Sequence, residues 1–64
     1  MRTTAFRTLM ADEFGSIRAA MIASDHVFAE LGGRTADQAL AAGLEPKDIW
    51  DAVCQVYDVP PNRR

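Results

Sequence analysis

Reactive side chains are scarce in this sequence. One cysteine and one histidine occur among 64 residues. Cys54 therefore has no partner for an internal disulfide, and zinc binding, which needs three or four converging His, Cys, Asp or Glu side chains, is not expected. A lone cysteine is typical of a reducing compartment. We expect a cytoplasmic protein with no metal and no other cofactor.

Long apolar stretches and a strong net charge are also missing. No uncharged apolar run approaches the ~20 residues of a membrane span, and the first ten residues lack the apolar core of a signal peptide. Seven lysines and arginines against nine aspartates and glutamates give a net charge of −2. Because no excess of positive charge attracts the chain to nucleic acid or anionic lipid, we expect no membrane partner and no general nucleic-acid binding.

The short length limits what the chain can do. A chain of 64 residues forms one domain and buries only roughly 60% of its surface on folding. Its stability therefore depends on helix caps, local propensity or an added partner. We expect a single helical domain over residues 1–64, too small to exclude water from a reaction site and therefore not an enzyme.

Turn and capping residues divide the chain into four helices. We expect these near residues 4–14, 16–31, 35–42 and 46–58, followed by a frayed basic tail over 60–64. Glycines stand where the first three helices end, Thr35 and Gln38 form a capping box, and Pro46 suits a first helical position. No segment alternates long enough for a strand. The prediction is an all-α fold, a compact bundle of three to four short helices.

The second predicted helix has the longest apolar stripe. Seven of its residues fall within about 120° of one another at ~100° per residue: Ile17, Ala20, Met21, Ser24, Val27, Phe28 and Leu31. We expect this face in the core. Ile22 then lies away from the stripe beside His26, which points to solvent near Glu30.

The fourth predicted helix has more apolar surface than one face needs. Ile49, Val53 and Val56 form an inner line, and three further residues widen the apolar arc to about 200°. Trp50 and Tyr57 on this flank are either core residues or anchors of a binding surface. In the second case the candidate interaction surface consists of Ile22, His26, Trp50, Cys54 and Tyr57. Its partner would be another protein or a second copy in a homodimer.

The last two helices have the spacing of a helix-turn-helix, with Ala39 in the first, Gly43 in the turn and Ile49 in the second. A DNA-reading helix presents basic or amide side chains near its start, whereas this one offers Asp48 and Asp51. Direct nucleic-acid binding is therefore the alternative function rather than the first. It would use Lys47, Arg63 and Arg64, with Arg34 if that residue lies nearby.

Asp25, His26 and Cys54 supply an acid, a base and a thiol. Adjacent residues of a helix point about 100° apart, so Asp25 cannot orient the ring of His26 through a side-chain bond. A thiol enzyme is a third hypothesis, and it predicts rapid alkylation of Cys54 in the folded state. We expect no catalytic residue, and we predict a small non-enzymatic module for protein–protein interaction.

Several segments taken together resemble one family. Residues 25–27, 31–35, 39–43, 46–50 and 52–54 are similar to a family of very short actinobacterial proteins, domain-of-unknown-function family 3046. The resemblance runs from Met1 and Arg2 to residues 58–60, with Glu45 as a departure from an aspartate. It implies a cytoplasmic single-domain helical protein and supplies no catalytic residue. Family genes lying near those of the recombinase and its regulator imply an auxiliary part in DNA repair.

Overall fold

Helices make up most of the chain. The computed structural model describes residues 1–64 as α1 (Thr3–Phe14), α2 (Ser16–Asp25), α3 (Ala36–Ala41) and α4 (Pro46–Val56), with short 3-10 helices η1 (Ala29–Leu31) and η2 (Pro61–Arg63). There is no strand, and one isolated antiparallel bridge joins Phe28 to Arg34. The predicted all-α bundle is confirmed. None of the helices is long and apolar enough to cross a membrane.

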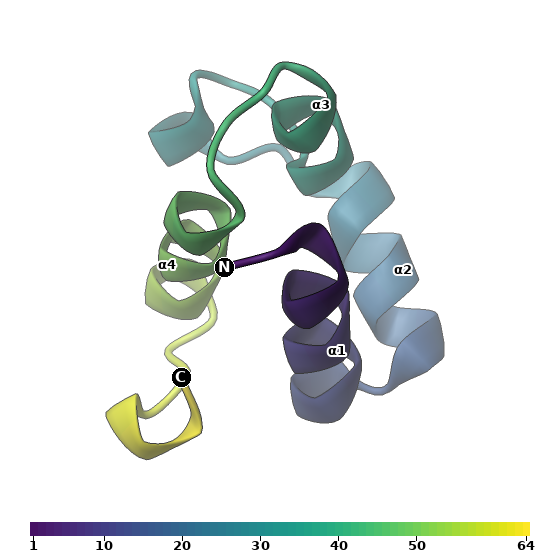
Figure 1. Ribbon diagram of the computed structural model, residues 1–64, viewed down its shortest axis with the longest axis vertical. Helices are drawn as coiled ribbons and strands as arrows, with labels where there is room; N and C mark the ends of the chain where they lie inside the picture. Colours follow the sequence, from purple (N-terminus) through teal and green to yellow (C-terminus); the bar gives the residue numbers. More distant parts are fainter.

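A single residue, Gly15, connects α1 to α2. Gly15 has φ of +82°, a backbone conformation that glycine adopts far more readily than other residues. After this turn α2 runs back alongside α1 (Figure 1). Ala19 and Ala23 are buried on the inner side of α2, and small side chains there allow two helices to approach closely.

The buried face of α2 differs from the sequence prediction. The residues that point inward are Ala19, Ile22 and Ala23, whereas Ile17 and Met21 are 80% and 57% exposed. The predicted stripe assumed one helix over residues 16–31, but α2 ends at Asp25 and His26 is extended, with φ of −80° and ψ of 122°. The prediction of the α2 face was therefore wrong.

The break after Asp25 explains this difference. Phe28 and Leu31 are buried as predicted, but they enter the core from the loop and from η1 rather than from α2. Because they no longer belong to the same helix, their burial does not determine which side of α2 faces inward. The tight Gly15 turn places the small residues of α2 against α1 instead.

Helices α3 and α4 are joined by the short segment 42–45 and contact each other, and the caps of both are the ones that the sequence predicts. Thr35 Oγ1 accepts a hydrogen bond from the backbone N–H of Gln38 at 3.1 Å, and the Gln38 side chain accepts one from the Thr35 N–H at 3.0 Å. This is the predicted capping box. Pro46 stands at the start of α4, where its missing N–H removes no helical bond. Ile49 and Val53 are buried as predicted, but the prediction that Val56 continues this inner line is wrong: Val56, the last residue of α4, is 41% exposed.

The core is centred on α4. Ile49, Trp50, Val53 and Cys54 are buried among residues from every other α-helix. The Trp50 ring meets the Phe6 ring of α1 edge to face, with 6.4 Å between centroids. Edge-to-face aromatic pairs add to the stabilisation from burial alone.

The C-terminal residues are not frayed, which corrects the predicted tail. Arg63 donates two hydrogen bonds to the Glu13 carboxylate, at 3.0 and 3.2 Å. Arg64 Nε donates to the Val59 carbonyl at 2.8 Å, and the Arg64 carbonyl accepts from the Trp50 indole N–H at 3.4 Å. The sequence prediction rests on Pro60 and Pro61, which end the last helix and leave a basic tail, whereas these bonds fasten the tail beside α1 and α4.

Candidate functional site

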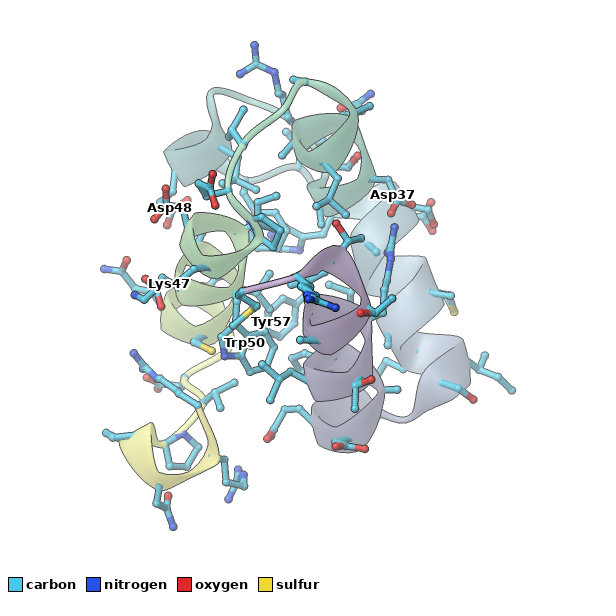
Figure 2. The ribbon with its side chains drawn as sticks, viewed as in Figure 1. Asp37, Lys47, Asp48, Trp50 and Tyr57 are labelled. Atoms are coloured by element: carbon cyan, nitrogen blue, oxygen red, sulfur yellow. The ribbon has the colours of Figure 1, made fainter.

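Three residues of the predicted interaction surface lie in the core. Trp50 is 2% exposed, Ile22 is 6% exposed and Cys54 is fully buried. Figure 2 shows the side chains of Trp50 and Tyr57 between α4 and α1. Because a folded monomer does not present these three side chains, the surface proposed from the sequence must be redrawn around residues that are exposed.

The other two residues of that surface, His26 and Tyr57, are half-buried and contact each other. The Tyr57 hydroxyl lies 2.9 Å from His26 Nδ1. The His26 ring stacks at 4.2 Å on Phe28, and the Tyr57 ring meets Phe14 edge to face at 5.3 Å. The expectation that His26 points to solvent near Glu30 is wrong, because the chain leaves the helix at this residue. This aromatic cluster joins the ends of α1, α2 and α4.

The acid, base and thiol of the enzyme hypothesis have other neighbours. Burial raises the pKa of the Cys54 thiol, so it stays protonated at neutral pH, and the thiolate is the reactive form. His26 is engaged with Tyr57, and the Asp25 carboxylate accepts a hydrogen bond from the Ser24 hydroxyl at 3.3 Å. No group of three or more His, Cys, Asp or Glu side chains is placed to hold a metal ion.

The basic residues of the nucleic-acid hypothesis bind within the chain. Lys47 pairs with Asp51 at 3.2 Å, Arg63 pairs with Glu13, Arg64 binds the Val59 carbonyl, and Arg34 binds the Leu31 carbonyl at 3.1 Å. Figure 2 shows Lys47 and Asp48 on the outer side of α4. The first turn of this helix presents a carboxylate beside a paired lysine, and this arrangement disfavours a phosphate.

The most exposed of the large apolar side chains lie on α2 or just after it. Ile17 and Met21 stand one turn apart on its outer side, Ala20 and Ser24 are exposed between and beyond them, and Val27 is exposed just after the helix. We call Ile17, Ala20, Met21 and Ser24 the α2 stripe. In Figure 1, α2 lies at the right edge of the molecule with no element drawn outside it. The stripe is therefore an apolar helix face without a partner in the folded chain.

A hollow lies next to this stripe. It occupies about 210 Å³, and its lining is mostly apolar: Arg7, Met10, Ala11, Ser16, Ala19 and Ala20. Arg7 is held at its side by an ion pair with Asp37 of α3, at 2.6 Å. Because Ala20 belongs to both the stripe and the lining, the hollow and the stripe form one continuous surface. A cavity of about 150 Å³ already admits a benzene ring, so this one has room for a large apolar side chain.

The sequence contains the signal for this surface, but the pattern alone predicts that Ile17 and Met21 belong to the core. Periodicity locates an apolar face on a helix but does not say what covers it. Because α2 ends at Asp25, the buried Phe28 and Leu31 do not belong to the same helix as Ile17 and Met21. The two pairs of residues can therefore differ in burial.

Residues 1–62 match the family described as Protein of unknown function (DUF3046). The chain belongs to the DUF3046 family. The resemblance predicted from the sequence is thereby confirmed. The chain is also similar to a protein of Mycobacterium tuberculosis that bears the name envelope-preserving system protein, with 47% identity over 36 residues. That match covers 56% of this chain and 13% of the mycobacterial protein. No solved structure matches.

Membership of the DUF3046 family assigns no chemical role to any residue. The function of this family member must therefore be sought in its surface, where the α2 stripe and the adjacent hollow bring exposed apolar side chains together.

Proposed function

We propose that this protein is a non-enzymatic helical module that binds another protein molecule, either a different protein or a second copy, through the α2 stripe. The observation that supports this most is the 80% exposure of Ile17 and the 57% exposure of Met21 on one side of one helix. Single exposed apolar residues are common on protein surfaces, but a stripe that continues into a hollow is typical of a docking site.

The hydrophobic core does not use the α2 stripe, so the stripe is free to bind a partner. The core holds fifteen buried hydrophobic residues without it. No buried side-chain nitrogen or oxygen lacks a hydrogen-bond partner. The core is therefore formed without the large side chains of the stripe. Burial of an aliphatic side chain against a partner is worth about 1.5 to 3 kcal/mol, so Ile17 and Met21 would be the main anchors.

The aromatic cluster supports this surface indirectly. His26 and Tyr57 hold the C-terminal end of α2 against α4, at 2.9 Å between Nδ1 and the hydroxyl. A helix anchored at both ends presents its outer side rigidly, which lowers the entropy lost on binding. Two residues of the surface predicted from the sequence thus gain a positioning role in the proposal.

The mycobacterial relative is consistent with a module. The matched 36 residues form 13% of that protein, so a related segment occurs inside a much longer chain. A segment that folds as a small helical unit and adds a binding surface fits such a setting.

The proposal is tested by a photoreactive amino acid placed at Met21, with Gln55 on the exposed side of α4 as the matched control position. We expect a protein adduct from position 21 and none from position 55 in an extract of the native host. Excess unmodified chain should suppress the adduct, whereas excess Met21→Glu should not.

Equal adducts from both positions, or none from position 21, would contradict the proposal. Retention on duplex or single-stranded DNA at low salt would instead favour the nucleic-acid alternative, and that binding should weaken steeply with added salt.

A further inference from the structure

We propose that the partner at the α2 stripe is a second copy of the chain, paired through antiparallel α2 helices about a two-fold axis. This inference rests on the proposed function, because it names the occupant of the same surface. A two-fold interface uses one patch twice, so the patch must be complementary to itself in shape and in charge. The outer side of α2 meets both requirements.

The spacing of the α2 stripe is self-complementary. Ile17, Ala20, Met21 and Ser24 occupy positions i, i+3, i+4 and i+7, which form one continuous row. In an antiparallel pair centred between Ala20 and Met21, each Ala20 faces Met21 of the partner subunit. Each Ile17 then faces Ser24 of the partner subunit. Every large side chain in the row is therefore opposite a small one, as close packing requires.

The charges beside the stripe are complementary in the same arrangement. Arg18 and Asp25 are the only charged residues of α2, and both are exposed. Seven residues apart, they lie on the same flank of the helix, two turns from each other. With the centre given above, Arg18 lies only about 3 Å along the axis from Asp25 of the partner subunit. The two-fold axis repeats this pair, so the interface would hold two ion pairs.

Both groups are available for these pairs. The three ion pairs within the chain are Arg7 with Asp37, Lys47 with Asp51 and Arg63 with Glu13, so neither Arg18 nor Asp25 has an ionic partner in the monomer. The Arg18 guanidinium lies 5.7 Å from the centre of the Phe14 ring, a contact that leaves its N–H groups free. A parallel pairing would instead place the two arginines at one level and the two aspartates at another, with no opposite-charge pair.

The hollow beside α2 gives the arrangement a socket. Ser16 and Ala20 of its lining lie on the flank opposite Arg18 and Asp25, toward α1. Met21 of the partner subunit faces Ala20, so its flexible side chain can enter this space of about 210 Å³. One short helix and one hollow from each copy bury on the order of 1,000 Å² in total, the low end of specific interfaces. The dimer should therefore be weak and reversible.

Sedimentation equilibrium with charge-reversal variants tests the proposal. We expect the parent chain to dimerise, and Arg18→Glu and Asp25→Arg each to weaken the dimer roughly tenfold or more, since each brings two pairs of like charges together. An equimolar mixture of the two variants should form a heterodimer, because both of its pairs are then of opposite charge. The double variant should recover the parent affinity, and circular dichroism should confirm that every variant is folded.

Other results would overturn the proposal. Single variants that dimerise as well as the parent, or a mixture that shows no recovery, would rule out the antiparallel pairing. A parent chain that stays monomeric at sub-millimolar concentration, while the photoreactive group at Met21 links to a different protein, would overturn self-association and leave the proposed function intact. A parent chain that stays monomeric and gives no adduct at position 21 would overturn both the self-association and the proposed function.

Discussion

Two isoleucines on α2 provide a direct test of how this helix is turned. The sequence pattern places Ile17 in the core and Ile22 away from it, whereas the structure leaves Ile17 80% exposed and Ile22 6% exposed. We consider Ile22→Ala and Ile17→Ala, two identical substitutions in one helix. The change in helix propensity is the same at both positions and cancels in the comparison.

The expected difference follows from burial. Ile22→Ala removes three carbon atoms from a packed site, about 2.4 kcal/mol by transfer, and leaves a cavity, so the cost should be about 2 to 4 kcal/mol. Ile17→Ala removes atoms that are already in water and should change stability by less than about 0.5 kcal/mol. A domain of this size has a free energy of unfolding of roughly 3 to 10 kcal/mol, so the first change is a large part of the total.

Urea unfolding followed by circular dichroism measures both variants at low micromolar concentration, where a weak dimer is dissociated. Because Ile22→Ala can unfold the chain outright, Ile22→Val and Ile17→Val extend the comparison, with about 1 kcal/mol expected at position 22 and almost none at position 17. A larger loss at Ile17 than at Ile22 would refute the orientation of α2 described above.

Three further predictions concern other parts of the molecule. Thr35→Ala removes the capping box and should cost about 1 kcal/mol in urea unfolding, whereas Thr35→Ser should retain most of it. Burial raises the pKa of Cys54 above its ordinary value of 9.0, so the folded chain holds this proton to higher pH than the unfolded chain does. Stability should fall above about pH 9 in the parent but not in Cys54→Ala, and a thiol reagent should label Cys54 slowly until urea is added. Deleting residues 62–64 removes the carbonyl that accepts from the Trp50 indole, so Trp50 emission should shift to the red while helical dichroism is retained; unchanged emission would contradict the docked tail.

Features set by local chemistry could be predicted from the sequence. The capping box at Thr35, the start of α4 at Pro46 and the all-α class all depend on residues within one turn of each other. The α1 end at Gly15 is of the same kind. These predictions hold because the nearest neighbours in the chain decide the conformation there.

Features that depend on contacts between residues far apart in the chain could not be predicted from the sequence. The end of α2 at Asp25 depends on the bridge between Phe28 and Arg34 and on the contact of His26 with Tyr57, which is thirty-one residues away in the sequence. The docked tail depends likewise on Arg63 meeting Glu13 across fifty residues. Composition and periodicity contain no information about such pairs, so the sequence alone predicts a frayed tail.

The candidate site was missed for the same reason. Ile17 and Met21 are apolar and helically spaced, and such residues usually belong to the core. Their exposure follows only from the small Ala19 and Ala23 packing against α1 after the Gly15 turn.

Solvent paramagnetic relaxation of the methyl groups measures the exposure of Ile17 and Met21, and with it the orientation of α2, most directly. A soluble gadolinium chelate should broaden the methyl signals of Ile17 and Met21 strongly in a dilute sample, while the Ile22 methyl signals stay sharp. Protected Ile17 and Met21 signals beside a broadened Ile22 would mean that α2 is turned the other way, and the binding surface proposed here would not exist.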